Sequence, residues 1–479
     1  MTRDANSLYL CLDQGGHASR AIVVDGRGDI RASAYSAIAT QREGDRVEHA
    51  PDEVVESLRS AAREVVASLG EAAEGLVAAG IATQRSSIVC WERDTGRALS
   101  PVISWQDTRA AAWLAEFRAH QDKVHGITGL VLSPHYGVSK LRWSLDNLHE
   151  VKTAQNNGSL VFGPLASYIV NRLAEEAPVL ADPANASRTL LWDRHTADWS
   201  DELLALFDVP RDCLPQAVPS KYSWGHLRVN DRLLPIEIVT GDQSAALFAF
   251  GAADDQTVYA NLGTGAFLQR SAGSGDVDPH GLLASVVYRD AEAAVQVIEA
   301  TVNGAGSAIN ALAAELGVAG DVVKRNSAEW LNTYAGEPLF LNAVSGLGSP
   351  WWRADARSAF SDSELTTPEN KLAAVMESIA FLIAVNLEHM QALLGAPDRM
   401  LVTGGLGSVD PLLQRIATLA GVAVERTEVS EATARGLACL LAGLPAHWPG
   451  PRTDALFEPL PDPALLDRYR RWRELMPPV

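Results

Sequence analysis

The chain has 479 residues, of which 47% are hydrophobic and 21% are charged. That length predicts two large lobes as the simplest domain count, and the composition excludes disordered, collagen-like and repeat-rod proteins. With 40 Lys plus Arg against 59 Asp plus Glu, the formal net charge is −19. Because this charge opposes binding to phosphate backbones and to anionic membranes, we expect no nucleic acid and no membrane among the partners.

The cysteines and the apolar stretches bear on the compartment. Four cysteines are scattered without a C-x-x-C pair, which is typical of reduced proteins with buried thiols. The start MTRDANSLYL lacks a basic-then-apolar signal pattern. The longest apolar stretch, 372–394, contains Glu377, Asn386, Glu388 and His389, and these favour a buried helix over a membrane span. We therefore expect a cytoplasmic protein.

The first lobe begins with short strands around glycine-bearing turns. The apolar pattern predicts strands over 8–12, 20–24, 30–38 and 76–82, and a helix over 51–70. In a dinucleotide-binding domain a helix would directly follow the first glycine turn. Three antiparallel strands, then a helix and another strand, instead suit the sheet of an actin-like ATPase lobe.

The first turn contains the residues Asp13, Gln14, Gly15, Gly16 and His17. Asp13 leaves the first strand and could hold Mg²⁺ through water, because that ion keeps most of its hydration shell and needs only one or two carboxylates. An Asp before a Gly is also an ordinary turn residue. His17 could donate to a phosphate or simply close the turn.

The strand over 76–82 ends in Gln84, Arg85 and Ser86, and a predicted strand over 102–105 delivers Trp105. An arginine fork can donate to two hydroxyls, and an indole can cover the apolar face of a polyol. We therefore consider Arg85 and Trp105 candidates for substrate contact. The alternatives are a surface salt bridge for Arg85 and a core position for Trp105. His135 and Tyr136 lie in a predicted loop over 133–137.

Near the midpoint, Asp242 lies between Gly241 and Gln243 at the end of an apolar run over 236–239. Strand ends are where α/β sheets meet their ligands, so this carboxylate is a candidate catalytic base. After it the opening pattern returns, with strands predicted over 257–262 and 266–271 around Gly263, Thr264 and Gly265. We expect the two halves to be structural duplicates.

The second half adds helices and a further glycine turn. Gly306 introduces a helix over 307–316, with Asn310 one turn in. Thr367 as N-cap, Pro368 at N1 and Gly395 as the stop define a long helix.

Next come a strand over 399–402, a turn with Gly404 and Gly405, and a helix over 411–419. That strand, turn and helix can cradle a phosphate or nucleoside with backbone N–H groups. The basic run Arg468, Arg470, Arg471 and Arg473 predicts the solvated face of a terminal helix.

Taken together, these stretches resemble the FGGY carbohydrate kinases. The resemblance is carried, in family order and over nearly the whole chain, by DQGGHASRAIVVD, GIATQRSSIVCW, ISWQDTR, TGLVLSPHYGVSKLRW, DPANASRTLLW, GDQSAALF, NLGTGAF, SGLGSPWWRADARSAF and TGGLGSVDPLLQRIATLAGVAVER.

The resemblance implies an α/β fold of two ribonuclease H-like, actin-like ATPase lobes with an active-site cleft between them. It also implies ATP and Mg²⁺ as cofactors and phosphorylation of a terminal hydroxyl. We expect residues 1–243 to form the N-terminal lobe, with the substrate and phosphate loops, and 244–479 the nucleotide-binding lobe. The partners expected are a small polyol or sugar substrate and, in a homodimer, a second copy of the chain.

The resemblance assigns roles residue by residue. Asp242 corresponds to the catalytic base, and together with Asp13 to the metal position. The implied substrate contacts are Arg85, Ser86, Trp105, His135, Tyr136, Asp242 and Gln243. The implied nucleotide and phosphate contacts are Gly15, His17, Arg20, Gly263, Thr264, Gly306, Asn310, Gly404 and Gly405.

The chain departs from the glycerol-phosphorylating branch of the family. Ser86 stands where that branch has a hydroxyl-binding glutamate, and His135 where it has a tyrosine, although Tyr136 is adjacent. Gly16 and His17 replace two threonines, and Val409 replaces an asparagine. A glutamate-to-serine exchange changes charge and reach, so we expect a polyol or ketose other than glycerol, and a larger one.

Two other functions use the same pattern. An actin-like or chaperone-like ATPase would also need duplicated lobes, but it gives no reason for Arg85, Trp105 and Gln243 to accompany the base. A catalytically weak pseudo-kinase that senses a sugar is suggested by Gly16, His17 and Val409. Polyol-dependent release of ADP separates the kinase from both.

Overall fold

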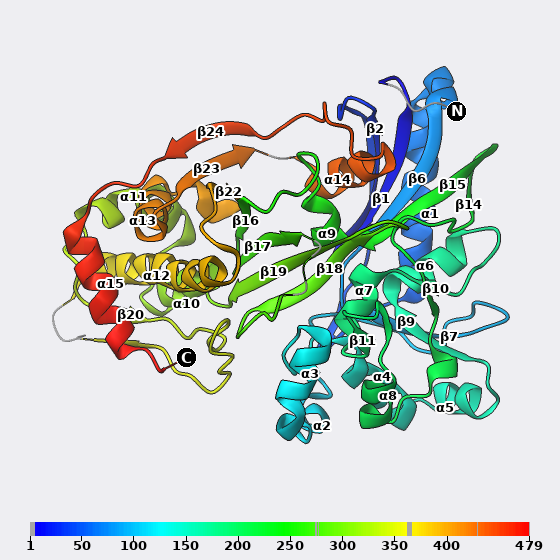
Figure 1. Cartoon of the computed structure of the whole chain (residues 1–479), viewed down its shortest axis with the longest axis horizontal. Coiled ribbons are helices and arrows are strands. Elements are labelled where there is room, and N and C mark those ends of the chain that lie inside the picture. Colours follow the sequence, from blue (N-terminus) through cyan, green and yellow to red (C-terminus); the bar gives the residue numbers. More distant parts are fainter. Residues whose placement is uncertain (1–4, 274, 276, 362–365, 429, 479) are drawn as a thin grey trace. The chain divides into compact units, whose positions relative to one another are not determined.

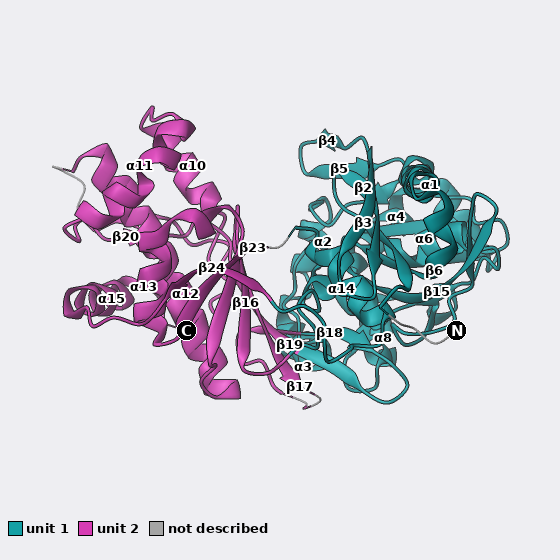
Figure 2. Ribbon diagram, turned by 90° about the horizontal axis from the view of Figure 1, so that it is seen from above, with its two compact units in different colours: residues 1–253, 285–296, 430–450 teal, residues 254–284, 297–429, 451–479 magenta. Residues whose placement is uncertain are grey.

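The computed structural model describes residues 5–273, 275, 277–361, 366–428 and 430–478 (Figure 1). It divides into two compact units, one of residues 1–253, 285–296 and 430–450 and one of residues 254–284, 297–429 and 451–479 (Figure 2). The first unit therefore includes a late segment of the chain, which contains helix α14 (Ala432–Leu441). Each unit has its own large β-sheet.

The sheet of the first unit has the strand order β14-β15-β6-β1-β2-β3. Its strands are β1 (Leu8–Gln14), β2 (Ala18–Asp25), β3 (Ile30–Ala37), β6 (Leu76–Thr83), β14 (His226–Val229) and β15 (Arg232–Gly241). β1 pairs antiparallel with β2 and parallel with β6, and β6 pairs parallel with β15. The carboxyl ends of three neighbouring strands, β1, β6 and β15, therefore meet at one edge of the sheet.

Helices cover both faces of this sheet. Leu10 and Leu12 of β1 belong to the core cluster that contains the apolar face of α1 (Pro51–Ser68). Gly80 of β6 lies against α14 instead, because a Cβ there would be 3.2 Å from Leu441 Cδ1 and 3.3 Å from Leu437 Cδ2. The near-continuous apolar sequence of β1 is what a strand buried on both faces requires.

A smaller sheet of the first unit has the order β4-β5-β8-β7-β9 and corrects one prediction. Its other strands are β4 (Gln41–Glu43), β5 (Arg46–His49), β7 (Ile88–Glu92) and β9 (Leu160–Pro164). The strand expected over 102–105 is only β8 (Val102–Ile103). The chain turns after it, since Asp107 N donates to Ser104 O at 3.0 Å and Asp107 Oδ2 accepts from Val47 N at 2.7 Å. Trp105 thus lies on a turn, 40% exposed, and not in a core.

The second unit repeats the central pattern of the first. The seven-stranded sheet whose strands β16, β17, β22, β23 and β24 lie in this unit has the order β18-β19-β17-β16-β22-β23-β24. The strands are β16 (Thr257–Leu262), β17 (Ala266–Gly273), β18 (Leu283–Arg289), β19 (Ala294–Val302), β22 (Arg399–Thr403), β23 (Ala423–Glu428) and β24 (Arg452–Phe457). β16 pairs antiparallel with β17 and parallel with β22, as β1 does with β2 and β6. This repeated pairing agrees with the predicted duplication.

The long helix α12 (Pro368–Leu394) is the centre of the second unit's core. Its ends are those predicted: Thr367 Oγ1 accepts from Asn370 N at 3.3 Å, Pro368 begins the helix, and Gly395 ends it with a φ of 77°. By length and composition alone α12 could cross a membrane, but 89% of its most apolar window is buried in the protein. It is a core helix.

The terminal helix α15 (Pro463–Leu475) corrects the prediction for the basic run. Arg468 is not solvated: its side chain is 11% exposed and donates to Glu377 at 2.8 and 3.0 Å. Glu377 lies inside α12 and also accepts from Arg415 Nε at 3.0 Å. A buried carboxylate is costly without such partners, so Arg468 joins α15 to α12. Arg470, by contrast, is 71% exposed.

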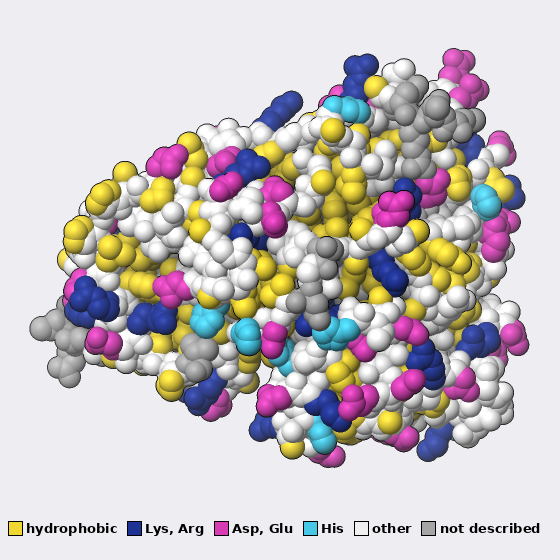
Figure 3. Space-filling view, viewed as in Figure 1, with side chains coloured by type: hydrophobic (Ala, Val, Ile, Leu, Met, Phe, Trp, Pro, Cys, Tyr) yellow, Lys and Arg dark blue, Asp and Glu magenta, His cyan; other side chains and the backbone are white. Residues whose placement is uncertain are grey.

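Charges of both signs are interspersed on the face of the molecule seen in Figure 3. Several form exposed ion pairs, such as Arg97 with Glu150 at 2.6 Å. Pairs of this kind contribute roughly 0–1 kcal/mol each. The apolar clusters around α1 and α12 therefore carry most of the stability.

Candidate active site

Three predicted site residues gather at one edge of the first unit's sheet. Asp13 lies beside Ala82 of β6 in the strand register, and Thr240 lies beside the same residue on the other side. Because the three strands run parallel, Arg85 after β6 and Asp242 after β15 continue from the same edge at which Asp13 lies. Strand ends of an α/β sheet are where ligands bind.

Asp242 is the first residue of the short helix α9 (Asp242–Ala246). Its Oδ1 accepts from Gln243 N at 2.7 Å, and its carbonyl accepts from Thr433 Oγ1 at 3.4 Å. Burial raises the pKa of the Asp242 carboxyl, while the positive charges of Arg85 and Arg188 act in the opposite direction. The group is therefore a carboxylate with increased affinity for a proton, as a general base requires.

Asp13 is only 8% exposed. Burial, and then the negative charge of Asp242, raise its pKa to about 7, and Arg20 opposes the shift. A cation next to two such carboxylates would offset their repulsion. The described residues contain no group of three or more His, Cys, Asp or Glu side chains that could hold a metal ion, but Mg²⁺ binds through one or two carboxylates together with water and phosphate. Asp13 and Asp242 fit that ion.

The turn between β1 and β2 brings the predicted phosphate residues next to the substrate loop. Gly15 N donates to Ala18 O at 2.9 Å and closes the turn, and His17 is exposed. Gln84 N donates to Gln14 O at 2.8 Å. The turn and the segment that leads into Arg85 are therefore held together by backbone bonding.

Arg20, on β2, also has a partner from far along the chain. Its Nη1 donates to Glu431 Oε2 at 3.1 Å, and the guanidinium side chain remains 48% exposed. Glu431 precedes α14 and has a φ of 57°. Arg20 thus places a positive charge near Asp13 and presents it to solvent.

The substrate candidates form a second group beside Asp242. Arg85 Nη2 donates to Gln243 Oε1. Ser86 has a φ of 67°, an unusual conformation for a residue other than glycine. His135 Nδ1 lies 2.9 Å from Trp105 O, and the two rings are 6.3 Å apart. The structure thus brings Trp105 and His135 into contact.

The loop before α4 (Gly137–Asn147) exposes His135 and buries Tyr136, which is 7% exposed. Of these two neighbours, His135 is therefore the one presented to solvent. Ser86 and His135 are joined through a third residue, Lys140, which sequence reasoning did not single out.

The remaining nucleotide candidates lie in the second unit. The turn after β16 contains Gly263 and Thr264, and the start of α10 (Gly306–Glu315) is bonded to it. Gly306 N donates to Gly263 O at 2.9 Å, and Ser307 N donates to Thr264 O at 3.0 Å. A Cβ at Gly306 would lie 2.8 Å from Gly263 O, so only glycine permits this approach. Asn310 follows on α10 and is exposed.

Gly404 and Gly405 follow β22, next to β16. Gly404 has a φ of 94°, and a Cβ there would lie 2.6 Å from Leu262 O. Gly405 has open space around its Cα. Val409, where an asparagine was expected from the resemblance, is 7% exposed. This second glycine turn therefore lies beside the strand that leads to the first one.

Sequence reasoning missed three charged residues at or near the first unit's site. Arg188 acts on the Asp242 carboxyl, Glu431 pairs with Arg20, and Lys140 bonds to Ser86 and His135. The only sequence signal was that Arg188 and Lys140 fall within motifs that carry the family resemblance. Their side-chain partners are set by the tertiary fold.

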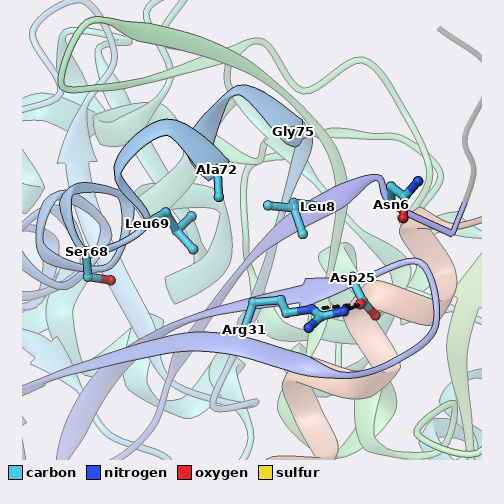
Figure 4. Close-up of a pocket in the computed structure, with 8 residues that line it drawn as sticks. All are labelled: Asn6, Leu8, Asp25, Arg31, Ser68, Leu69, Ala72 and Gly75. Carbon is cyan, nitrogen blue, oxygen red and sulfur yellow. Dashed lines mark hydrogen bonds and ion pairs between the residues drawn. The ribbon is translucent and has the colours of Figure 1, made fainter.

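A separate pocket of about 510 Å³ lies elsewhere on the first unit (Figure 4). It is lined by Asn6, Leu8, Asp25, Arg31, Ser68, Leu69, Ala72 and Gly75. Asp25 and Arg31 form an ion pair there, and Asp25 also accepts from Arg27 N and Asp29 N, each at 2.9 Å. None of the predicted site residues lines this pocket.

The two units share a repeated sheet pattern, the first places Asp13 and Asp242 at one strand edge, and both carry glycine turns, which is typical of the actin-like ATPase class. The chain also matches family models. Residues 8–249 match the N-terminal domain of the FGGY family of carbohydrate kinases, and residues 258–443 match its C-terminal domain.

Glycerol kinases from two bacteria are similar to the chain over nearly its whole length, in agreement with this match. The chain is 35% identical to a glycerol kinase of Bordetella parapertussis over 503 aligned residues, which cover 98% of this chain and 96% of the relative. It is also 35% identical to a glycerol kinase of Thermus brockianus, with 97% of each chain covered.

Solved structures agree on the fold. The glycerol kinase of Plasmodium falciparum with ADP superimposes with a TM-score of 0.86 at 24% identity, covering 98% of this chain and 97% of that one. The xylulose kinase of Rhodospirillum rubrum gives a TM-score of 0.85 at 20% identity, with 98% of each chain covered.

The chain belongs to the FGGY family of carbohydrate kinases. It is accordingly an ATP-dependent phosphotransferase that acts with Mg²⁺ on a hydroxyl of a small polyol or sugar. The predicted family, fold class, enzyme class and cofactors are confirmed. Family membership favours the kinase over the ATPase and the sugar-sensing pseudo-kinase.

Proposed function

We propose that this kinase phosphorylates a terminal hydroxyl of a polyol or ketose larger than glycerol, with Asp242 as the catalytic base. The observation that carries this proposal is the grouping of Asp242, Arg85 and Gln243 at one strand edge, with the Arg85 guanidinium bonded to Gln243. An ATPase that only hydrolyses its nucleotide does not require a hydrogen-bonding pair such as Arg85 and Gln243 next to its catalytic base.

Asp242 accepts the proton of the attacking hydroxyl as the phosphoryl group is transferred. Its raised pKa favours proton uptake, while Arg85 and Arg188 keep enough positive charge nearby to stabilise the anion before reaction. A general base of this kind contributes roughly 10²–10⁴-fold in rate.

Asp13 and Asp242 would hold the Mg²⁺ ion, which neutralises charge on the transferring phosphoryl group. In the first unit the phosphate contacts are assigned to Gly15, His17 and Arg20. In the second, the N–H groups at the start of α10 and in the two glycine turns are assigned to the nucleotide, because helix N-termini and glycine turns favour anions. The assigned residues there are Gly263, Thr264, Gly306, Asn310, Gly404 and Gly405.

The substrate contacts are assigned to Arg85, Ser86, Trp105, His135 and Gln243. Ser86 is shorter than the glutamate of the glycerol-phosphorylating branch and removes one negative charge, which leaves room for additional carbon and hydroxyl groups. Trp105, 40% exposed, can cover the apolar face of such a substrate. His135 uses Nδ1 on Trp105 O, so Nε2 is the ring nitrogen that can contact the substrate.

The proposal also includes the domain boundary and the compartment. We assign residues 1–243 to the substrate lobe and 244–479 to the nucleotide lobe; the first compact unit also includes residues 244–253, 285–296 and 430–450. Cys11, Cys90, Cys213 and Cys439 are free and buried, which supports a reducing, cytoplasmic compartment.

A coupled ADP-release screen tests the substrate. Glycerol, tetritols, pentitols and ketopentoses are each supplied with ATP and Mg²⁺, and kcat/KM is compared. We expect the highest kcat/KM for a substrate of four or five carbons. A highest value for glycerol would contradict the substrate assignment, and ADP release without any polyol would contradict the kinase reaction.

A further inference from the structure

One buried ammonium group links two of the proposed substrate residues. Lys140, on α4, is 1% exposed. Its Nζ donates to the backbone carbonyl of Ser86 at 3.3 Å and to the backbone carbonyl of His135. Ser86 lies in the loop after β6 and His135 in the loop before α4, so a single side chain joins two loops. Lys140 is 54 residues from Ser86 and 5 residues from His135 along the chain.

These bonds belong to a closed ring. From His135, Nδ1 contacts Trp105 O at 2.9 Å. Trp105 N then donates a hydrogen bond to Ser87 Oγ at 3.0 Å, and Ser87 is the neighbour of Ser86. The ring therefore passes through Ser86, Lys140, His135 and Trp105 and returns through Ser87. Three of the proposed substrate residues are members of it.

Burying the charged side chain of a lysine at this position costs free energy. Burial lowers the pKa of Lys140 to about 7, with Arg109 acting in the same direction and Asp107 against it. An apolar residue on α4 would avoid that cost but could not hold a carbonyl. Ser86 also has a left-handed backbone, with a φ of 67°, which surrounding contacts must maintain. The ammonium bond to its carbonyl is such a contact.

We propose that Lys140 is a positioning residue for the polyol site: its ammonium fixes the spacing of Ser86, His135 and Trp105 by holding both loop carbonyls. The inference rests on the proposed function, because it takes those three residues as substrate contacts. Lys140 itself does not touch the substrate. A merely structural lysine would instead affect stability and leave the kinetic constants of the folded enzyme unchanged.

The test compares variants of the full-length enzyme. Lys140→Met removes the donor at similar length, Lys140→Gln keeps a neutral donor, and Lys152→Met changes an exposed lysine on the next helix, α5 (His149–Asn156). For each we would measure the KM for polyol, the KM for ATP, kcat and the unfolding temperature, with all kinetics well below unfolding.

We expect Lys140→Met to raise the polyol KM by about 10- to 100-fold, as the loss of two hydrogen bonds implies. The ATP KM should stay near that of wild type, Lys140→Gln should recover part of the loss, and Lys152→Met should behave as wild type. An unchanged polyol KM in Lys140→Met, or an equal rise in both KM values, would overturn the inference. If Lys140→Met does not fold, the same comparison with Lys140→Gln decides.

Failure of the proposed function gives a different result. Arg85→Ala serves as the reference, because Arg85 is assigned to the substrate directly. If wild type shows no polyol-dependent ADP release, or Arg85→Ala leaves the polyol KM unchanged, the substrate site itself is wrong. If Arg85→Ala raises the polyol KM and Lys140→Met does not, only the role of Lys140 is wrong.

Discussion

The Arg85 guanidinium donates a hydrogen bond to the side-chain oxygen of Gln243. This bond joins the loop after β6 to the start of α9, next to Asp242. The close packing depends on Gly241, because a Cβ there would lie 2.6 Å from both Cγ and Cδ of Arg85. Arg85 is thereby fixed beside the proposed base, where its guanidinium can meet substrate hydroxyls.

Arg85→Lys should weaken polyol binding. Lysine keeps the charge but lacks the planar fork that can bond Gln243 and a substrate together. The loss of a charged hydrogen bond, about 1.5–3 kcal/mol, predicts a rise of about 10- to 100-fold in the polyol KM. Steady-state kinetics would check this, with Arg97→Lys as the control at a side chain that is 56% exposed. A polyol KM like that of wild type would count against Arg85 as a substrate contact.

Gly241→Ala should act through Arg85. The added methyl group would displace the flexible Arg85 side chain from Gln243, so we expect a higher polyol KM with little change in unfolding temperature. Gly126→Ala, on α3 (Gln121–Thr128), is the matched control, because a Cβ there meets nothing within 4 Å. Equal kinetics for the two variants would show that the position of Arg85 is unimportant.

Gly306→Ala should affect ATP instead of the polyol. The added Cβ would clash with the carbonyl oxygen of Gly263. Because that oxygen belongs to the backbone, relieving the clash would require the turn itself to shift. We expect the ATP KM to rise about tenfold or more, since 1.4 kcal/mol is a factor of ten. Gly320→Ala, at the start of α11 (Gly320–Thr333), has open space and serves as control. A rise in the polyol KM alone would contradict the nucleotide assignment.

Much of the site could be predicted because it follows from local sequence. Strand ends mark Asp13 and Asp242, and glycines mark the turns at Gly263 and Gly404. The ends of α12 also follow from three local residues. Local patterns could not reveal Glu431 as the partner of Arg20, because 411 residues separate them. Nor could they show that the chain turns at Ser104 and places Trp105 outside the sheet.

Charged side chains on helices were the hardest to predict. An apolar helix pattern says which face is buried, but not what a buried charge meets there. The sequence predicts Arg468 as a solvated residue, but it bonds to Glu377, and nothing in the local sequence marks the partners of Lys140. In both cases the partner comes from another element, so only the tertiary structure identifies it.

The stability of the protein should depend on pH through Lys140. Its pKa is about 7 when folded and near an ordinary lysine value of about 10.4 when unfolded. Between these values the unfolded chain binds a proton that the folded chain has released, so this group makes stability increase as pH rises. Lys140→Met lacks the effect.

Denaturant unfolding of wild type and Lys140→Met across that pH window would check this prediction. The free energy of unfolding of wild type relative to the variant should rise from about pH 7 toward about pH 10. A difference that stays constant over the window would mean that burial does not lower the pKa of Lys140.

The catalytic role of Asp242 is tested most directly by Asp242→Asn, which keeps the shape of the side chain but cannot accept the proton. The measurement is kcat for polyol-dependent ADP release, with folding checked by thermal unfolding and with Asp231→Asn as control at an exposed carboxylate just before β15. We predict a loss of roughly 10²–10⁴-fold in kcat for Asp242→Asn with the fold intact, and none for the control. Retention of most of the activity by Asp242→Asn would contradict Asp242 as the base.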